Sequence, residues 1–163
     1  MNSKMIPVAV INPDAPPESL EAKQPAIDNG AEIYGKDGYF SLDQMEREWE
    51  KVWTESWLIA GVSSDLQAVG DYFLFRVRSE SIIVTKTEEG VKAFYNVCPH
   101  RGARLLTEER GNKKVFVCPF HSWSFRNSGE LRTITDEETF QDAVICHRPG
   151  LTSVACDEHA GLI

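Results

Sequence analysis

The sequence predicts a mainly β protein: an antiparallel fold with two similar loops that contain Cys and His, preceded by one α-helix. Three observations support this prediction. Short runs of β-branched and aromatic residues, separated by glycine-containing turns, fill much of residues 57–97, as is typical of antiparallel sheets. Helical periodicity is clear over residues 41–57. Two loops, at residues 98–102 and 118–121, carry Cys and His at short spacings, and we expect each at the tip of a β-hairpin.

The composition is that of one globular domain with appendages. The chain has 163 residues, of which 42% are hydrophobic and 26% are charged. No apolar run approaches the length of a membrane span, and the N-terminal residues lack the pattern of a signal peptide. We therefore expect a cytoplasmic protein that does not bind membranes, with Cys146 and Cys156 reduced. The net charge of −8 argues against nucleic-acid binding.

Two regions of the chain differ in composition. Residues 1–38 hold five of the eight prolines and show little periodicity, so we expect an extended arm or an unstructured tail there. Residues 39–163 are expected to form one domain, which begins with the helix over residues 41–57.

This helix has a recognisable start and one apolar face. Ser41 and Gln44 form a capping box, and Asp43 and Glu46 suit the positive end of the helix dipole. The apolar residues at helical spacing are Leu42, Met45, Trp49, Val52 and Trp53. We expect this stripe to pack against the core.

The strand signals follow the helix. Within residues 71–78, Tyr72 and Leu74 alternate with Phe73 and Phe75, as on the two faces of a strand. The other expected strands cover residues 57–60, 81–86, 91–97, 115–117, 122–126, 144–146 and 152–156, with turns at residues 88–90 and 127–129.

Four side chains in the two loops have the chemistry of metal ligands. One residue separates Cys98 from His100, 17 residues separate His100 from Cys118, and two separate Cys118 from His121. Two Cys and two His suit either zinc or an iron–sulfur cluster. Zinc fingers usually group Cys with Cys and His with His, whereas a Rieske cluster needs two Cys on one iron and two His on the other. The mixed pairs favour the Rieske arrangement; a zinc site, or two buried Cys and two unrelated surface His, are the alternatives.

The residues around these ligands extend into two longer motifs. The first reads Asn96-Val97-Cys98-Pro99-His100-Arg101-Gly102-Ala103-Arg104-Leu105, and the second reads Cys118-Pro119-Phe120-His121-Ser122-Trp123-Ser124-Phe125 and ends at Gly129-Glu130-Leu131. Together they resemble the Rieske domain of ring-hydroxylating oxygenase α subunits, over about residues 40–163. The resemblance implies a Rieske-type β fold that holds a [2Fe–2S] cluster, with Cys98 and Cys118 on one iron and His100 and His121 on the other. Ser122 stands where that family usually has Gly, so a change in loop geometry or cluster potential is expected.

The resemblance also implies a cluster of low reduction potential. Respiratory-type Rieske proteins carry an extra Cys in each loop, which together form a disulfide, and Ser and Tyr donors after the second His. The matching positions here are Ala103, Phe120, Trp123 and Phe125. These side chains can form neither the disulfide nor the hydroxyl hydrogen bonds that raise the potential.

In the family, this domain passes electrons derived from NAD(P)H within an oxygenase that uses O₂. The implied donor is a ferredoxin or flavin reductase, and the implied acceptor is a mononuclear non-heme Fe(II) in a catalytic domain. The iron motif of that domain resembles D-x-x-H-x-x-x-x-H, which His147 and His159 do not match. We therefore expect no catalytic residue in this chain, which would be truncated before the catalytic domain. A homotrimer is implied for the full-length protein, and aromatic hydrocarbon catabolism is the commonest role of the family.

Two other functions fit the same residues. One is a free-standing Rieske ferredoxin-type electron carrier, although the helix and the Pro-rich arm exceed what a minimal carrier needs. The other is a zinc-stabilised interaction module, which would be colourless and redox-silent.

Positive charge gathers around the two loops. Residues 98–132 have a net charge of +4, which leaves −12 for the rest of the chain. The basic residues are Arg101, Arg104, Arg110, Lys113, Lys114, Arg126 and Arg132. This basic collar either steers an acidic electron donor toward the loops or is an ordinary solvated surface.

Overall fold

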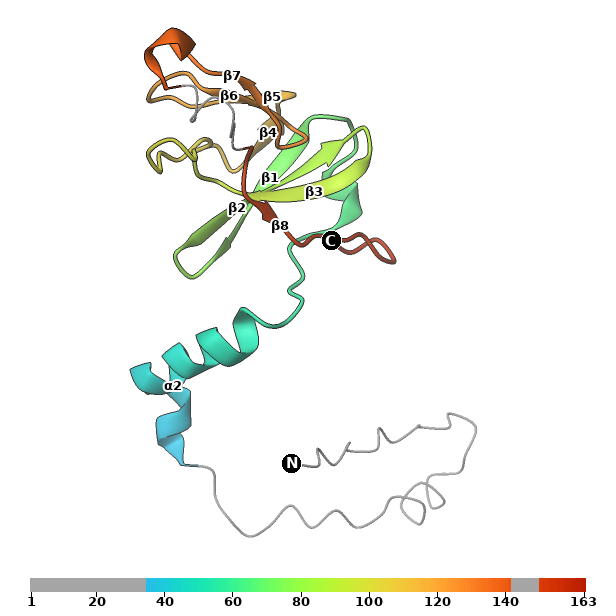
Figure 1. The fold of residues 1–163 in the computed structure, drawn as a ribbon. Coiled ribbons are helices and arrows are strands. Elements are labelled where there is room, and N and C mark those ends of the chain that lie inside the picture. The colour runs from blue at the N-terminus through green and yellow to red at the C-terminus, as the bar shows by residue number, and fades with distance from the viewer. Residues whose placement is uncertain (1–34, 142–149) are drawn as a thin grey trace, which may run out of the picture. The chain divides into compact units, whose positions relative to one another are not determined.

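The computed structural model describes residues 35–141 and 150–163 (Figure 1). The chain divides into two compact units, Met1–Glu55 and Ser56–Ile163. Residues 1–34 of the expected arm, the expected strand at residues 144–146 and His147 lie outside the described residues. The expected division into an arm and one domain from residue 39 onward stays a prediction.

The first unit is helical in its described part. Its segments are η1 (Lys36–Tyr39), α2 (Leu42–Glu48) and η2 (Trp49–Trp53), the last a π-helical turn. The predicted N-cap is confirmed, because the Ser41 hydroxyl accepts a hydrogen bond from the Gln44 N–H at 3.3 Å. The side chain of Gln44 donates to Glu48 at 2.9 Å, so among the described residues only the Ser41 half of the predicted capping box is confirmed.

One expectation for this helix was wrong. The helix ends at Trp53 and not at residue 57, after a last turn in which the Thr54 N–H donates to the Trp49 carbonyl at 3.1 Å. Within its own unit the apolar stripe is not covered, since no residue of α2 or η2 is buried and Leu42 is 73% exposed. Its expected packing against the core stays a prediction. The described part of this unit contains no second layer of structure against which the stripe could pack.

The second unit consists of two antiparallel sheets, as the sequence predicts (Figure 1). The larger sheet has the strand order β4-β1-β2-β3-β8, and its strands are β1 (Asp71–Val77), β2 (Glu80–Thr87), β3 (Gly90–Tyr95), β4 (Arg110–Asn112) and β8 (Ser153–Val154). The smaller sheet has the order β5-β6-β7, with strands β5 (Val115–Val117), β6 (Ser124–Arg126) and β7 (Leu131–Thr133). Two short 3₁₀ turns, η3 (Ser63–Asp65) and η4 (Glu137–Thr139), complete the described elements.

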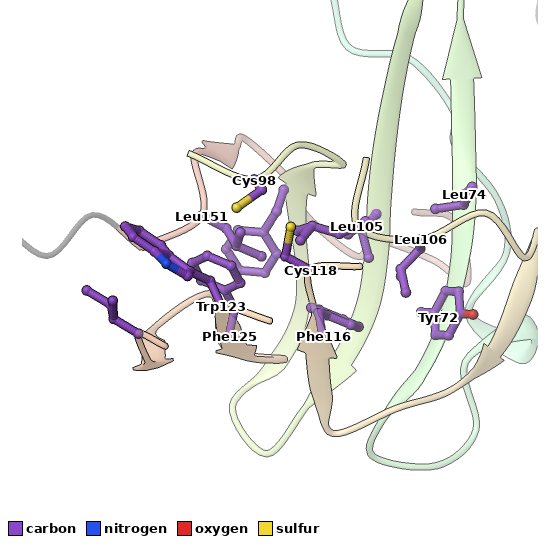
Figure 2. Close-up of a cluster of buried hydrophobic side chains, with 13 residues drawn as sticks. Tyr72, Leu74, Cys98, Leu105, Leu106, Phe116, Cys118, Trp123, Phe125 and Leu151 are labelled. Atoms are coloured by element: carbon purple, nitrogen blue, oxygen red, sulfur yellow. The ribbon is translucent and has the colours of Figure 1, made fainter. Parts of the chain in front are cut away.

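Both faces of the larger sheet are buried, which explains the apolar character of its central strands. Tyr72 and Leu74 belong to one hydrophobic cluster, and Phe73 belongs to another on the opposite face. This is the alternation expected for β1. The first cluster also contains Phe116 and Phe125 from the smaller sheet (Figure 2). The two sheets therefore pack through this face.

The two loops that contain Cys and His leave the sheets in different ways. The second loop joins β5 to β6, which pair with each other, so it is the expected hairpin tip. The first loop joins β3 to β4, and these strands are separated in the sheet by β1 and β2. It is therefore a crossing connection and not the hairpin that we expected.

A few short segments also differ from the expectations. Strands β4 and β7 were not predicted, because three mostly polar, exposed residues give no periodic signal. Residues 57–60 form no strand, although the Ala60 N–H donates to the Ile163 carbonyl at 2.7 Å. None of the helices in the described ranges is long and apolar enough to cross a membrane.

Candidate metal centre

The structure brings the four predicted ligands together as two pairs. Cys98 and Cys118 are almost fully buried, with exposed fractions of 1% and 2%, and both belong to the cluster between the sheets (Figure 2). His100 and His121 are half-buried, and their ring centroids are 4.7 Å apart. The site therefore has an inner sulfur pair and an outer imidazole pair.

The two loops share one backbone design. In the first loop, the Cys98 N–H donates to the Ala103 carbonyl at 2.7 Å and the Gly102 N–H donates to the Cys98 carbonyl at 2.9 Å. In the second loop, the Cys118 N–H donates to the Trp123 carbonyl at 2.8 Å and the Ser122 N–H donates to the Cys118 carbonyl at 3.0 Å. Each Cys thus pairs with the residues four and five positions later.

This hydrogen-bond pattern places the fourth residue after each Cys in a left-handed backbone conformation. Gly102 and Ser122 both have left-handed backbones, with φ of +74° and +58°. Glycine adopts this conformation without strain, whereas another residue pays about 1–2 kcal/mol. The second loop therefore keeps the left-handed turn of the first, and the expected change in loop geometry or cluster potential at Ser122 stays a prediction.

Asn96 anchors the first loop to the body of the fold. Its side chain is buried, and its Oδ1 accepts from the Leu105 N–H at 3.1 Å and the Leu106 N–H at 2.9 Å. Its Nδ2 donates to the Leu106 carbonyl at 2.7 Å and to the Ser81 hydroxyl at 3.2 Å. Asn96 therefore ties the end of β3 to the segment that leaves the loop. Its position in the motif was noted from the sequence, but its anchoring role was not predicted.

Aromatic rings surround the imidazole pair. The indole of Trp123 is stacked on the His100 ring, with centroids 4.6 Å apart and planes 4° apart. Phe140 meets both of these rings edge-on, at 5.8 Å from His100 and 5.6 Å from Trp123. Phe120 lies against His121 at 4.0 Å and is 61% exposed. These contacts were not predicted from the sequence.

The surroundings of Cys98 and His100 favour the neutral forms of these two side chains. Burial raises the pKa of the Cys98 thiol, the nearby Cys118 raises it further, and the backbone N–H groups of His100 and Arg101 oppose this shift. Burial lowers the pKa of His100, as do the charges of His121 and Arg101. The neutral imidazole is the form that binds metal, while a thiol must lose its proton on binding.

The donor set fits a two-iron group. The Nδ1 atom of His121 is buried and has no hydrogen-bond partner among the described residues, as expected for a nitrogen that binds metal. Cys98 and Cys118 are free thiols. Within the part of the chain that the structure covers, no three His, Cys, Asp or Glu side chains surround a single point. The donors are two buried thiols and two half-buried imidazoles, which are the types and numbers of ligand that a [2Fe–2S] cluster of the Rieske type requires.

The other residues that the sequence pointed to are His159, Cys156 and the basic collar. His159 is exposed in a C-terminal turn, where its N–H donates to the Leu162 carbonyl at 2.9 Å. Cys156 is a half-buried free thiol whose pKa is raised by burial and by Asp157 and Glu158. All seven residues of the basic collar are exposed. Arg110 forms an ion pair with Asp65 at 3.0 Å.

The sequence of this chain is similar to those of known proteins. A family model described as "Rieske [2Fe-2S] domain" matches residues 56–148. The carnitine monooxygenase oxygenase subunit of Escherichia coli (strain K12) is 35% identical over 126 residues, which cover 77% of this chain and 33% of that protein. The large oxygenase component of the naphthalene 1,2-dioxygenase system of Pseudomonas aeruginosa is 36% identical over 113 residues, which cover 68% of this chain and 25% of that protein.

Solved structures agree with this match. The quaternary ammonium Rieske monooxygenase CntA in complex with L-carnitine has a TM-score of 0.70 and 31% identity, covering 79% of this chain and 37% of that one. A naphthalene 1,2-dioxygenase with bound indole has a TM-score of 0.66 and 32% identity, covering 72% and 27%. The chain spans about a third of the length of the carnitine monooxygenase subunit that it matches.

Proposed function

Because this chain belongs to the Rieske [2Fe–2S] domain family, we propose that its own ligands are Cys98 and Cys118 for one iron and His100 and His121 for the other. The observation that carries this assignment is the donor set itself. It consists of two buried thiols and two half-buried imidazoles, and one imidazole has a buried nitrogen without a hydrogen-bond partner among the described residues. When bound, the cluster supplies one-electron transfer.

The inner thiols and the outer imidazoles of the proposed site lie in different surroundings. The inner thiols are shielded from water by the packed sheets, which protects them from oxidation and exchange. The backbone N–H groups of His100 and Arg101 lie within hydrogen-bonding reach of the Cys98 sulfur and favour its thiolate. The outer imidazoles lie at the surface, where a redox partner can approach.

We infer a low reduction potential from the same loops. Hydrogen bonds to the sulfurs raise the potential of an iron–sulfur centre. The positions that supply extra hydroxyl donors and a disulfide in respiratory-type proteins hold Phe120, Trp123, Phe125 and Ala103 here. A measured potential well into the positive part of the range from about −150 to +300 mV would contradict this inference.

The whole protein is proposed to be the oxygenase component of a Rieske non-heme iron oxygenase. Its electrons would come from NAD(P)H through a ferredoxin or flavin reductase, and a mononuclear iron in a catalytic domain would receive them. The relatives named above are a carnitine monooxygenase subunit and a naphthalene dioxygenase component. Quaternary amines and aromatic hydrocarbons are therefore the two substrate classes to test first.

A free-standing electron carrier is the second candidate. The observation that favours it is that both cluster loops and their supporting sheets lie within Ser56–Ile163. Reconstitution with the reductase alone would separate the two functions, since a carrier passes electrons to an external acceptor whereas an oxygenase couples them to O₂ and substrate.

The ligand assignment is tested by electron paramagnetic resonance before and after dithionite, with iron, sulfide and zinc assays on the same sample. We expect a Rieske-type signal only after reduction, and two irons per chain. Cys118→Ser should abolish the signal, while Cys156→Ser, at a half-buried thiol outside the loops, should leave it intact. A colourless chain with one zinc would overturn the assignment.

A further inference from the structure

The two imidazoles of the site are held in place differently. His100 is stacked face-to-face on Trp123, with the ring planes only 4° apart, and Phe140 closes the edge of this pair. His121 instead contacts Phe120, with an angle of 39° between the two ring planes, and Phe120 is largely exposed. A mostly exposed ring restrains its neighbour little, so only His100 has a rigid aromatic support.

This support crosses between the loops. Trp123 is 2% exposed, and its carbonyl accepts the hydrogen bond that closes the second loop at the Cys118 N–H. Its ring, however, lies on the imidazole of the first loop. The position of one loop thereby sets the ring orientation of a side chain in the other.

The indole N–H contributes nothing visible to this arrangement. Trp123 Nε1 is buried and has no hydrogen-bond partner among the described residues. A buried donor without a partner destabilises the folded state. The ring, and not its polar atom, therefore makes the contacts that the structure shows.

We propose that Trp123 is a positioning residue that fixes the ring plane of His100 for metal binding, with Phe140 as its lateral support. The proposal rests on the proposed function, because it assumes that His100 is a ligand. It adds that the ligand is oriented by stacking across the loops. An aromatic pair of this kind is worth about 0.5–1.5 kcal/mol beyond its buried area.

The competing explanation is that Trp123 merely fills the core. Phe125 supplies the matched control, because it is a fully buried aromatic on β6 in the same hydrophobic cluster. Trp123→Leu and Phe125→Leu both remove a buried ring, but only the first removes the stack on His100. Trp123→Phe keeps an aromatic face and removes the indole N–H.

The test uses the iron-loaded chain and measures the paramagnetic resonance spectrum of the reduced state, the reduction potential and the rate of iron release to a chelator. For Trp123→Leu we expect altered g-values and release about two- to tenfold faster than wild type. Trp123→Phe should stay close to wild type, and Phe125→Leu should lower the unfolding midpoint without changing the spectrum. Equal spectra and release rates for Trp123→Leu and Phe125→Leu would overturn the proposal. So would a Trp123→Phe variant as impaired as Trp123→Leu, since the N–H would then be responsible.

A second comparison decides the matter if Trp123→Leu does not fold. Phe140→Leu removes the support of His100, and Phe120→Leu removes the ring beside His121. We expect the first to change the spectrum and iron release more than the second, and the reverse order or no difference would refute the proposal. A wild-type chain without any Rieske signal would instead refute the proposed function, so the two failures are distinguishable.

Discussion

Replacing Asn96 with alanine is expected to destabilise the chain more than any single exposed substitution. The side chain of Asn96 is 4% exposed and satisfies three buried backbone groups: the N–H of Leu105, and the N–H and carbonyl of Leu106. Alanine leaves all three without a partner, in a place where the packed sheets admit little water.

The expected loss in the free energy of unfolding is estimated from these three backbone groups. Each buried polar group left unsatisfied costs about 1–3 kcal/mol. Partial relaxation of residues 105 and 106 toward solvent recovers some of this, so we expect a loss of about 3–5 kcal/mol in the free energy of unfolding. This loss is a large part of the 5–15 kcal/mol that typical domains possess.

The assay is urea unfolding followed by circular dichroism and tryptophan fluorescence. Asn112→Ala is the matched control, because Asn112 is exposed and its amide donates to the Val69 carbonyl at 3.3 Å and to Asp71 at 2.8 Å. The control should cost less than about 1 kcal/mol. If Asn96→Ala cost no more than Asn112→Ala, the anchoring role of Asn96 would be refuted.

Three further predictions concern backbone strain, acid stability and close packing. Ser122→Gly should raise the free energy of unfolding by about 1 kcal/mol, because the φ of +58° is strained for serine; a loss of stability in urea unfolding would contradict this. The hydrogen bond from the Ala68 N–H lowers the pKa of the Asp71 carboxyl group. The ionised carboxylate therefore stabilises the fold above its unfolded pKa of about 3.9, and this stabilisation is lost as the pH falls through the folded pKa. In Asp71→Asn the free energy of unfolding should therefore fall less steeply than in wild type as the pH drops below about 4. Equal slopes for the two proteins in urea unfolding at several pH values would contradict this prediction. Gly129→Ala should cost about 2–5 kcal/mol, since its Cβ would lie 2.3 Å from the Phe94 ring and its φ is +91°; a thermal midpoint equal to wild type would refute the close approach.

The central strands could be predicted because their signals are long. β1 alternates Tyr72 and Leu74 with Phe73 over seven residues, and both faces meet a hydrophobic cluster. β4 and β7 have three residues each and are largely polar, so pairing with neighbours defines them and no local pattern does. For the helix, the local pattern is strong and the surroundings are not encoded: amphipathicity predicts an apolar face but not the part of the protein that covers it.

The proposed ligands could be selected from the sequence for a local reason, because the Cys and the His of each loop lie within four residues of each other. That they are ligands stays a prediction. Their surroundings could not be predicted. The stack of Trp123 on His100 joins two loops that follow strands of different sheets, and no spacing in the sequence encodes the plane of a ring. The left-handed turn at Ser122 was missed because serine gives no signal for it, although Gly102 occupies the same place in the first loop.

The placement of the two loops on different sheets has a mechanical consequence. Cys98 follows β3 of the larger sheet, and Cys118 follows β5 of the smaller one. A metal group that joins these cysteines acts as a cross-link between the sheets and closes a chain loop of about 20 residues. By the entropy argument for disulfides, such a closure is worth about 3 kcal/mol. Removal of the metal would therefore loosen the smaller sheet first, and hydrogen exchange in β5 and β6 would accelerate before exchange in β1 and β2.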